Sequence, residues 1–226
     1  MKYILTLLMF IAFLTTEAQE KKPAAQLLKE PAAWSFERFN LPPVFAPNFQ
    51  YKGVEELRFS PGMFDKNSTE YFTYAFAAQL DDRINMTKED VRDYLFNYFK
   101  ALCSSTARDH KLVVDTSAIT VSIEKKKNTS KEITYNTTLH VFGVFADGAA
   151  VQLNMEVKVL PVEAGKKVYL IFIASPHAKN DDVWKQLYLI QKNFGSDTIF
   201  NLHYFNYSHH YCISAIAVHT KQTIGF

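Results

Sequence analysis

Cysteine is nearly absent from this chain of 226 residues, which contains only Cys103 and Cys212. A framework of several disulfides, the usual support of small secreted domains, is therefore excluded. Two alternatives stay open for this pair. The two residues form one bridge, which requires Cα atoms within about 7 Å of each other, or Cys103 is a buried helix residue and Cys212 an unrelated thiol.

An excess of one charge is also missing, because 25 lysines and arginines face 23 aspartates and glutamates and leave a formal net charge of +2. Such a balance indicates neither a nucleic-acid partner nor an anionic membrane surface. Hydrophobic residues make up 48% of the chain and aromatic residues 15%, which is enough material for a sizeable core. We therefore expect a folded protein with no nucleic-acid partner.

The common catalytic and cofactor signatures are absent as well. The chain contains no GxSxG, HExxH, CxxC, GxGxxG or P-loop sequence. Nucleophile elbows, zinc proteases, thioredoxin-type redox sites and nucleotide-binding loops therefore have no support. We expect no cofactor, and the sequence leans away from an enzyme without excluding one.

Long hydrophobic runs are limited to the first residues. Lys2 precedes an apolar run over residues 4–14, and Thr16 and Ala18 are small residues at the positions that a signal peptidase reads. This pattern predicts a signal peptide that is cleaved after Ala18, with export to the periplasm or the extracellular space. No later run reaches about 18 apolar residues, so we expect no transmembrane segment in the mature chain.

The remaining chain divides into three parts by composition. Residues 19–33 are charged, rich in alanine and interrupted by prolines, which predicts a flexible lead. Residues 34–195 carry the patterns of a single α+β domain. Residues 196–226 form an atypical tail that contains four of the seven histidines but only two formally charged residues. The tail is either a final pair of strands or an extension produced by a frameshift or read-through.

The clearest element is an amphipathic helix that begins at Thr87. Thr87 and Asp90 have nearly the spacing of a capping box, and apolar residues then recur at helical intervals on one stripe. The stripe consists of Val91, Tyr94, Leu95, Tyr98, Phe99, Leu102 and Cys103. A second helix is expected to open at Asp181 or Asp182 and to end before Gly195.

Strands are predicted before and after the long helix. Residues 54–59 and 70–80 read as a pair with a long connection, and residues 118–124, 133–145, 151–160 and 168–175 follow with short connections. Short connections require antiparallel neighbours, so the last four form a meander. Residues 169–173 are apolar on both faces, which predicts a strand that is central or covered on both sides.

The fold class that follows is α+β. We expect a twisted antiparallel sheet of about six strands in the order β-β-α-β-β-β-β-α, packed on one long helix, with a second helix near the C-terminus and the helices on one face.

The segment at residues 51–64, YKGVEELRFSPGMF, is similar to a segment of uncharacterised exported bacterial proteins. The resemblance extends over residues 34–194. It implies export but no activity, ligand or site residue.

Two pairs of residues are candidates for chemistry. A turn at residues 147–149 that pairs Ala146 with Ala150 sets His140 opposite Glu156 on neighbouring strands. An imidazole held by a carboxylate suits a general base or a metal ligand, although a solvated cross-strand pair looks the same.

The second pair is His177 and Asp181, or Asp182, at the end of a buried strand and the start of a helix. Sites often form at such positions, although an aspartate there is also an ordinary helix cap.

A third candidate lies in the tail, where His203, His209, His210 and His219 supply enough imidazoles for Zn, Cu or Ni. Because adjacent residues of a strand point to opposite faces, only one of His209 and His210 can join the others. The metal set that we expect is His203, His209 and His219.

These observations favour an exported, soluble, non-enzymatic binding or envelope-associated protein of unknown ligand and partner. The alternative is an extracytoplasmic hydrolase or lipid-binding protein, with a small apolar ligand in a pocket between the long helix and the sheet. A pocket there, approached by a carboxylate or histidine of perturbed pKa, favours the alternative. A filled core with a flat polar outer face favours the binding protein.

Overall fold

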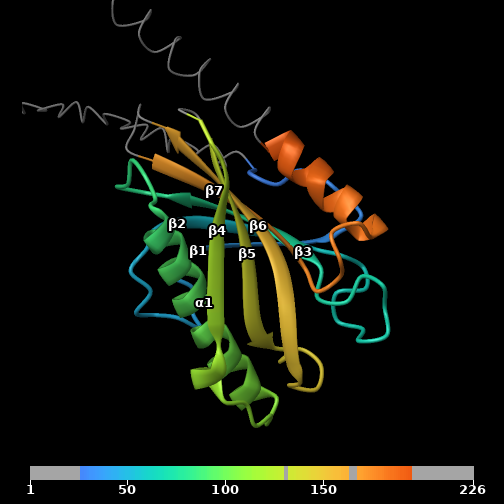
Figure 1. The fold of residues 1–226 in the computed structure, drawn as a ribbon. Coiled ribbons are helices and arrows are strands. Elements are labelled where there is room, and N and C mark those ends of the chain that lie inside the picture. Colours follow the sequence, from blue (N-terminus) through green and yellow to red (C-terminus); the bar gives the residue numbers. More distant parts are fainter. Residues whose placement is uncertain (1–25, 130–131, 163–166, 195–226) are drawn as a thin grey trace, which may run out of the picture.

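The computed structural model describes residues 26–129, 132–162 and 167–194. These residues form one seven-stranded antiparallel sheet in the order β1-β2-β3-β7-β6-β5-β4, with helices packed on it (Figure 1). The strands are β1 (Ser35–Leu41), β2 (Gly53–Phe59), β3 (Tyr74–Leu80), β4 (Thr120–Asn128), β5 (Ile133–Phe142), β6 (Ala150–Val162) and β7 (Lys167–Ser175). The expected α+β class and the antiparallel meander from β4 to β7 are confirmed.

The helix α1 (Lys88–Asp109) begins with the capping box that the sequence indicates. The Asp90 amide donates to the Thr87 hydroxyl at 3.1 Å, and the Thr87 amide donates to the Asp90 carboxylate at 2.9 Å. The predicted stripe packs on the sheet, with all its members buried except the half-buried Leu102. Each large apolar side chain buried there contributes roughly 1.5–3 kcal/mol before its loss of entropy.

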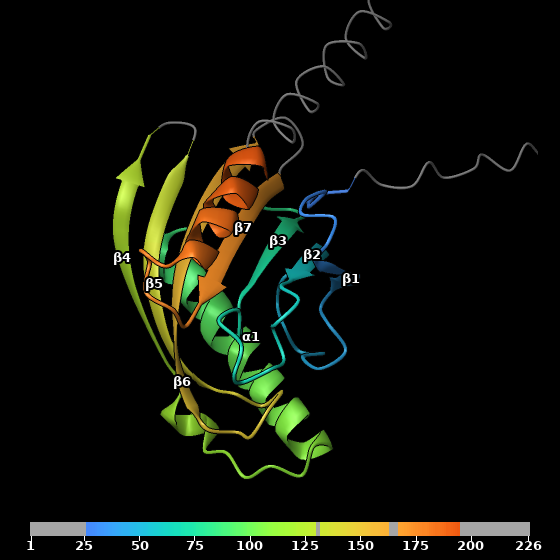
Figure 2. The ribbon, with the colours of Figure 1, turned by 90° about the vertical axis from the view of Figure 1, so that its right-hand side faces the viewer.

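The second helix, of which residues 182–194 are described, lies on the opposite face of the sheet from α1 (Figure 2). The expectation that both helices share one face is therefore wrong. Alternate residues of β7 explain the difference, because Leu170 and Phe172 pack in the core beside α1 whereas Ile171 and Ile173 pack beside the second helix. The apolar character of both faces of this strand, which the sequence shows, follows from its position between two cores.

The first strand was not expected. The sequence patterns predicted no element at residues 35–41, but these residues pair with β2 from Ser35↔Phe59 to Leu41↔Gly53. Most of this edge strand is exposed, so it lacks the alternation of apolar and polar residues that marks a half-buried strand. Its backbone pairing and the Arg58 guanidinium, 4.6 Å from the centre of the Phe36 ring, hold it in place.

The predicted register between the fifth and sixth strands is also wrong. Ala150 pairs with Phe142 and not with Ala146, so that residues 143–149 form a longer loop. In this loop Gly148 has a positive φ, +74°, and its amide donates to the carbonyl of Gly143 at 3.0 Å. The observed register differs from the predicted one by four residues. Because this number is even, each side chain of the two strands still points to the face that was predicted for it.

The chain before β1 is clamped to β2 by two buried charged side chains. Glu56 accepts hydrogen bonds from the amides of Leu27 and Leu28 at 2.7 and 2.8 Å. Arg58 donates to the carbonyls of Leu28, Lys29 and Trp34 at 3.0–3.2 Å. Leu28 and Trp34 are buried in the core beside the second helix. We call residues 26–34 the strap; the described part of the expected flexible lead is thus packed on the sheet.

Several expectations fall outside the described residues. They are the signal peptide, residues 19–25 of the lead, Cys212 and the tail with His203, His209, His210 and His219. Cys103 is a buried free thiol that lies 3.9 Å from the carbonyl oxygen of Phe142. Within the described ranges, no helix has the length and apolar character needed to cross a membrane.

Candidate functional site

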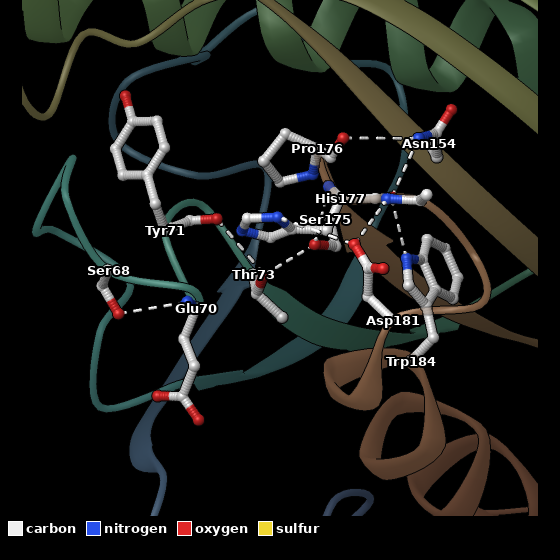
Figure 3. Close-up of polar contacts among 11 residues, drawn as sticks. Ser68, Glu70, Tyr71, Thr73, Asn154, Ser175, Pro176, His177, Asp181 and Trp184 are labelled. Atoms are coloured by element: carbon white, nitrogen blue, oxygen red, sulfur yellow. Dashed lines mark hydrogen bonds and ion pairs between the residues drawn. The ribbon is translucent and has the colours of Figure 1, made fainter.

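The loop of residues 176–181, between β7 and the second helix, brings together the predicted pair His177 and Asp181 (Figure 3). The backbone of His177 is fixed on both sides. Its amide donates to the Ser175 hydroxyl at 3.2 Å, and its carbonyl accepts from the Trp184 indole at 3.0 Å and from the Asn154 amide at 3.1 Å. The loop is therefore anchored to β6, β7 and the second helix.

The imidazole of His177 faces the carboxylate of Asp181, with 4.0 Å between Nδ1 and Oδ2. Asp181 also accepts a hydrogen bond from the Ala178 amide at 3.2 Å. Nε2 of His177 is buried and has no hydrogen-bond partner among the described residues. Asp182, the other carboxylate considered at this position, is exposed and pairs with Lys185 at 2.7 Å. The structure thus selects Asp181 as the partner of His177.

Ser175 lies next to this pair but is not placed as a nucleophile. Its side chain is fully buried, and its hydroxyl shares a 2.8 Å hydrogen bond with the hydroxyl of Thr73. Thr73 in turn lies at 3.2 Å from the carbonyl oxygen of Tyr71, in the loop before β3 (Figure 3). A nucleophilic serine must reach a substrate, and this one is enclosed by protein. The cluster is therefore a structural junction with a histidine at its edge.

A second polar cluster lies beside the same loop and is centred on Glu156 of β6. This carboxylate is buried, and one of its oxygens accepts from Lys126, Lys179 and the Tyr188 hydroxyl at 2.8, 2.9 and 2.9 Å. Lys179 also donates to Asn136 at 2.9 Å. We call Lys126, Lys179 and Glu156 the lysine cluster.

The electrostatics of the lysine cluster keep Glu156 ionised. Burial works against the charged carboxylate, but the bonds from Lys126 and Lys179 outweigh it and lower the pKa of Glu156 below its ordinary value. Burial and the hydrogen bond to Glu156 raise the pKa of Tyr188 to about 12. The cluster therefore holds two cations around one buried anion.

The outer face of β4, β5 and β6 continues from this cluster as a surface of small polar side chains. Among the described residues, the second helix lies over β6 and β7 and leaves β4 and β5 uncovered on that side (Figure 2). Pairing between the three strands aligns the side chains in two rows of three. We call them the polar array, which consists of Thr120, His140 and Gln152 in one row and Ser122, Thr138 and Asn154 in the next.

The predicted pair of His140 and Glu156 is not formed. His140 pairs with Gln152 and is exposed, while Glu156 pairs with Asn136 and is buried. The two residues lie on the same face but four positions apart along β6, roughly 13 Å at the usual rise of a strand. The described residues contain no group of three or more histidine, cysteine or acidic side chains arranged to hold a metal ion.

Besides Glu56 and Glu156, a third carboxylate is buried, that of Glu55, which lies between α1 and the sheet. It was not among the candidates predicted from the sequence. Its two oxygens accept hydrogen bonds from the hydroxyls of Tyr94 and Tyr98, each at 2.7 Å. Burial raises the pKa of Glu55 to about 7, and the two tyrosine hydroxyls act in the opposite direction. The sequence does contain an indication of this carboxylate. Glu55 and Glu56 are adjacent in an apolar strand, so one of them must lie on each face of the sheet.

Comparison with known proteins adds no assignment to these sites: no protein-family model, curated protein or solved structure matches the chain.

Proposed function

We propose that this protein is exported to the periplasm or beyond the cell and acts as a non-enzymatic binding protein through the polar array on β4, β5 and β6. One contrast supports the proposal: within the described residues the space between α1 and the sheet is filled by side chains, whereas β4, β5 and the Gln152 end of β6 present an open, polar face on the opposite side. Four members of the array, Thr120, Ser122, His140 and Gln152, are exposed.

Aromatic packing between α1 and the sheet supports the binding function over the rival one, a hydrolase or lipid-binding protein with a pocket beneath α1. The rings of Phe76 and Phe172 stack with their centres 4.1 Å apart, and Tyr94 lies 5.4 Å from Phe172. All three side chains are fully buried. A hollow does border α1, but it is lined by residues 45–50 of the segment between β1 and β2, together with Asn97 and Ala101.

Export is tested separately from binding. The full chain is expressed with its first residues intact, and the protein in the extracytoplasmic fraction is analysed by intact mass. We expect a species that begins at Gln19. Retention of the full-length mass in the cytoplasmic fraction contradicts export.

Binding is tested with a panel of immobilised polysaccharides and with a variant that obstructs the array. Thr138 occupies the middle strand of the array, so Thr138→Trp places a large ring in its centre. Arg92→Trp, at an exposed position on α1, is the matched control. We expect Thr138→Trp to reduce retention at least tenfold and the control to retain wild-type binding. Equal retention by both variants, or a lipid that co-purifies with the wild-type protein, contradicts the proposal.

A further inference from the structure

Glu156 of the lysine cluster lies on the same face as the polar array, in the row that follows it. Glu124, Asn136 and Glu156 pair across β4, β5 and β6 in the row that follows Ser122, Thr138 and Asn154. Rows on one face of a strand are about 6.6 Å apart and neighbouring strands about 4.8 Å apart. A ligand that lies along the strands of the array therefore reaches the lysine cluster.

The side chains of this face select the class of ligand by their hydrogen-bonding groups. The array offers hydroxyl, amide and imidazole groups, which both donate and accept hydrogen bonds. The large hydrophobic side chains that are exposed in the described residues are Phe36, Val44, Phe64, Ile84, Val113 and Leu189, and none of them lies on β4, β5 or β6. Protein interfaces usually have an apolar or aromatic centre, so this face suits a polyhydroxylated ligand better than a protein partner.

The lysine cluster adds a positive charge at one end. Lys126 and Lys179 remain 45% and 36% exposed while they contact Glu156, whose side chain is 2% exposed. Each ammonium has three donors, of which Glu156 and Asn136 take only part. Within the cluster itself, two cations surround one buried carboxylate, so one positive charge of the cluster is not balanced by Glu156. The exposed carboxylate of Glu124 in the same row opposes this positive charge. Removing the negative charge of Glu124 should therefore strengthen the binding of an anionic ligand.

We propose that the open face binds an acidic polysaccharide, whose hydroxyl groups contact the polar array and whose carboxylate groups contact Lys126 and Lys179. The inference rests on the proposed binding function and names the ligand class for the same surface. Glu156 acts as a positioning residue, because its buried carboxylate holds the two ammonium groups side by side. The indole of Trp184, 5.4 Å from the Lys179 ammonium, restricts that side chain further.

The experiment compares an oligogalacturonate with a neutral maltooligosaccharide of the same length, by isothermal titration calorimetry at low and moderate salt. We expect the acidic oligomer to bind at least tenfold more tightly than the neutral one, with an affinity that falls as salt rises. Lys126→Gln and Lys179→Gln should each weaken binding of the acidic oligomer about fivefold or more. Glu124→Gln should strengthen it, because that substitution removes a negative charge from the same row.

Lys185→Gln is the matched control, since Lys185 lies on the neighbouring helix and pairs with Asp182. Thermal unfolding of each variant verifies that the fold is retained. If the acidic oligomer does not bind, or if Lys126→Gln and Lys179→Gln bind it as tightly as Lys185→Gln does, the inference is overturned. If neutral polysaccharides bind and Thr138→Trp abolishes that binding, the binding function stands while the acidic ligand is rejected.

Discussion

Three buried glutamates of this protein show how neighbouring side chains decide the state of a carboxylate. Glu156 has two lysines beside it, and its pKa is lowered. Glu56 is bonded to Arg38 and to two backbone amides, yet burial still raises its pKa. Glu55 has only tyrosine hydroxyls as partners, and burial raises its pKa to about 7. The charge of Glu55 should therefore change near neutral pH.

Glu55 should make the stability of the protein depend on pH between about 5 and 8. Its pKa is raised in the folded state to about 7 from 4.5, so the folded protein holds the proton more tightly than the unfolded chain does. The associated stability is present in full below pH 4.5 and is lost as pH rises through about 7. We expect the free energy of unfolding of the wild type, relative to Glu55→Gln, to fall by about 2–3 kcal/mol over this interval.

Urea denaturation of both proteins at pH 5, 6, 7 and 8 measures this difference. Glutamine preserves the size of the side chain and supplies polar groups for the two tyrosines, so it is suitable as a permanently neutral reference. Parallel pH profiles for the two proteins would show that Glu55 does not titrate in this range.

Among the elements, a single strand, β2, supplies the charged side chains that bind the backbone of the strap. Arg58 donates to three strap carbonyls and Glu56 accepts from two strap amides, so β2 binds the backbone of residues 26–34 through charged side chains. Hydrogen bonds to charged groups contribute about 1.5–3 kcal/mol each. The contacts that hold the strap are therefore local to β2 and to the apolar anchors Leu28 and Trp34.

Arg58→Met should release the strap while the rest of the fold persists. The methionine fills part of the volume but cannot bond the carbonyls of Leu28, Lys29 and Trp34. We expect trypsin under native conditions to cleave after Lys29 roughly tenfold faster than in the wild type, with cleavage after Lys100 of α1 unchanged. Arg92→Met, which alters an exposed arginine, is the control. Unchanged cleavage after Lys29 would show that the apolar anchors alone hold the strap.

The elements also show what sequence patterns can establish. The capping residues and stripe of α1 were predictable, because contacts within one helix repeat at a fixed spacing. The edge strand β1 was not, because its stability comes from pairing with β2 and not from a buried face. The predicted partner of His140 was wrong for a similar reason, because the length of the loop at residues 143–149 sets the register between β5 and β6.

The polar sites were harder to predict than the elements. Glu55 and Glu56 are adjacent in sequence, but their partners come from α1 and from the strap. The contacts of Glu156 come from β4, the 176–181 loop and the second helix. A single sequence carries no signal for such distant pairings, whereas His177 and Asp181, four residues apart, were found.

At the scale of the whole molecule, β7 joins two cores. One core lies between the sheet and α1, and the other lies between the sheet, the second helix and the strap. β7 is central in the sheet, and its residues Val168 to Ser175 are all buried. A strand that contributes alternate side chains to both cores cannot leave one of them without disturbing the other, so the two cores should unfold together.

Phe172→Ala tests this coupling, because Phe172 packs on the α1 side while both tryptophans of the chain, Trp34 and Trp184, are buried on the other side. Tryptophan fluorescence therefore reports the core that the substitution does not touch, and circular dichroism at 222 nm reports the helices. We expect the free energy of unfolding measured by each signal to fall by about 3–5 kcal/mol, and we expect the two urea transitions to coincide. Ile171→Ala, on the opposite face, should shift both signals as well, by about 2–5 kcal/mol. A fluorescence transition that stays at its wild-type midpoint in Phe172→Ala would mean that the two cores are separate folding units, with β7 dividing them.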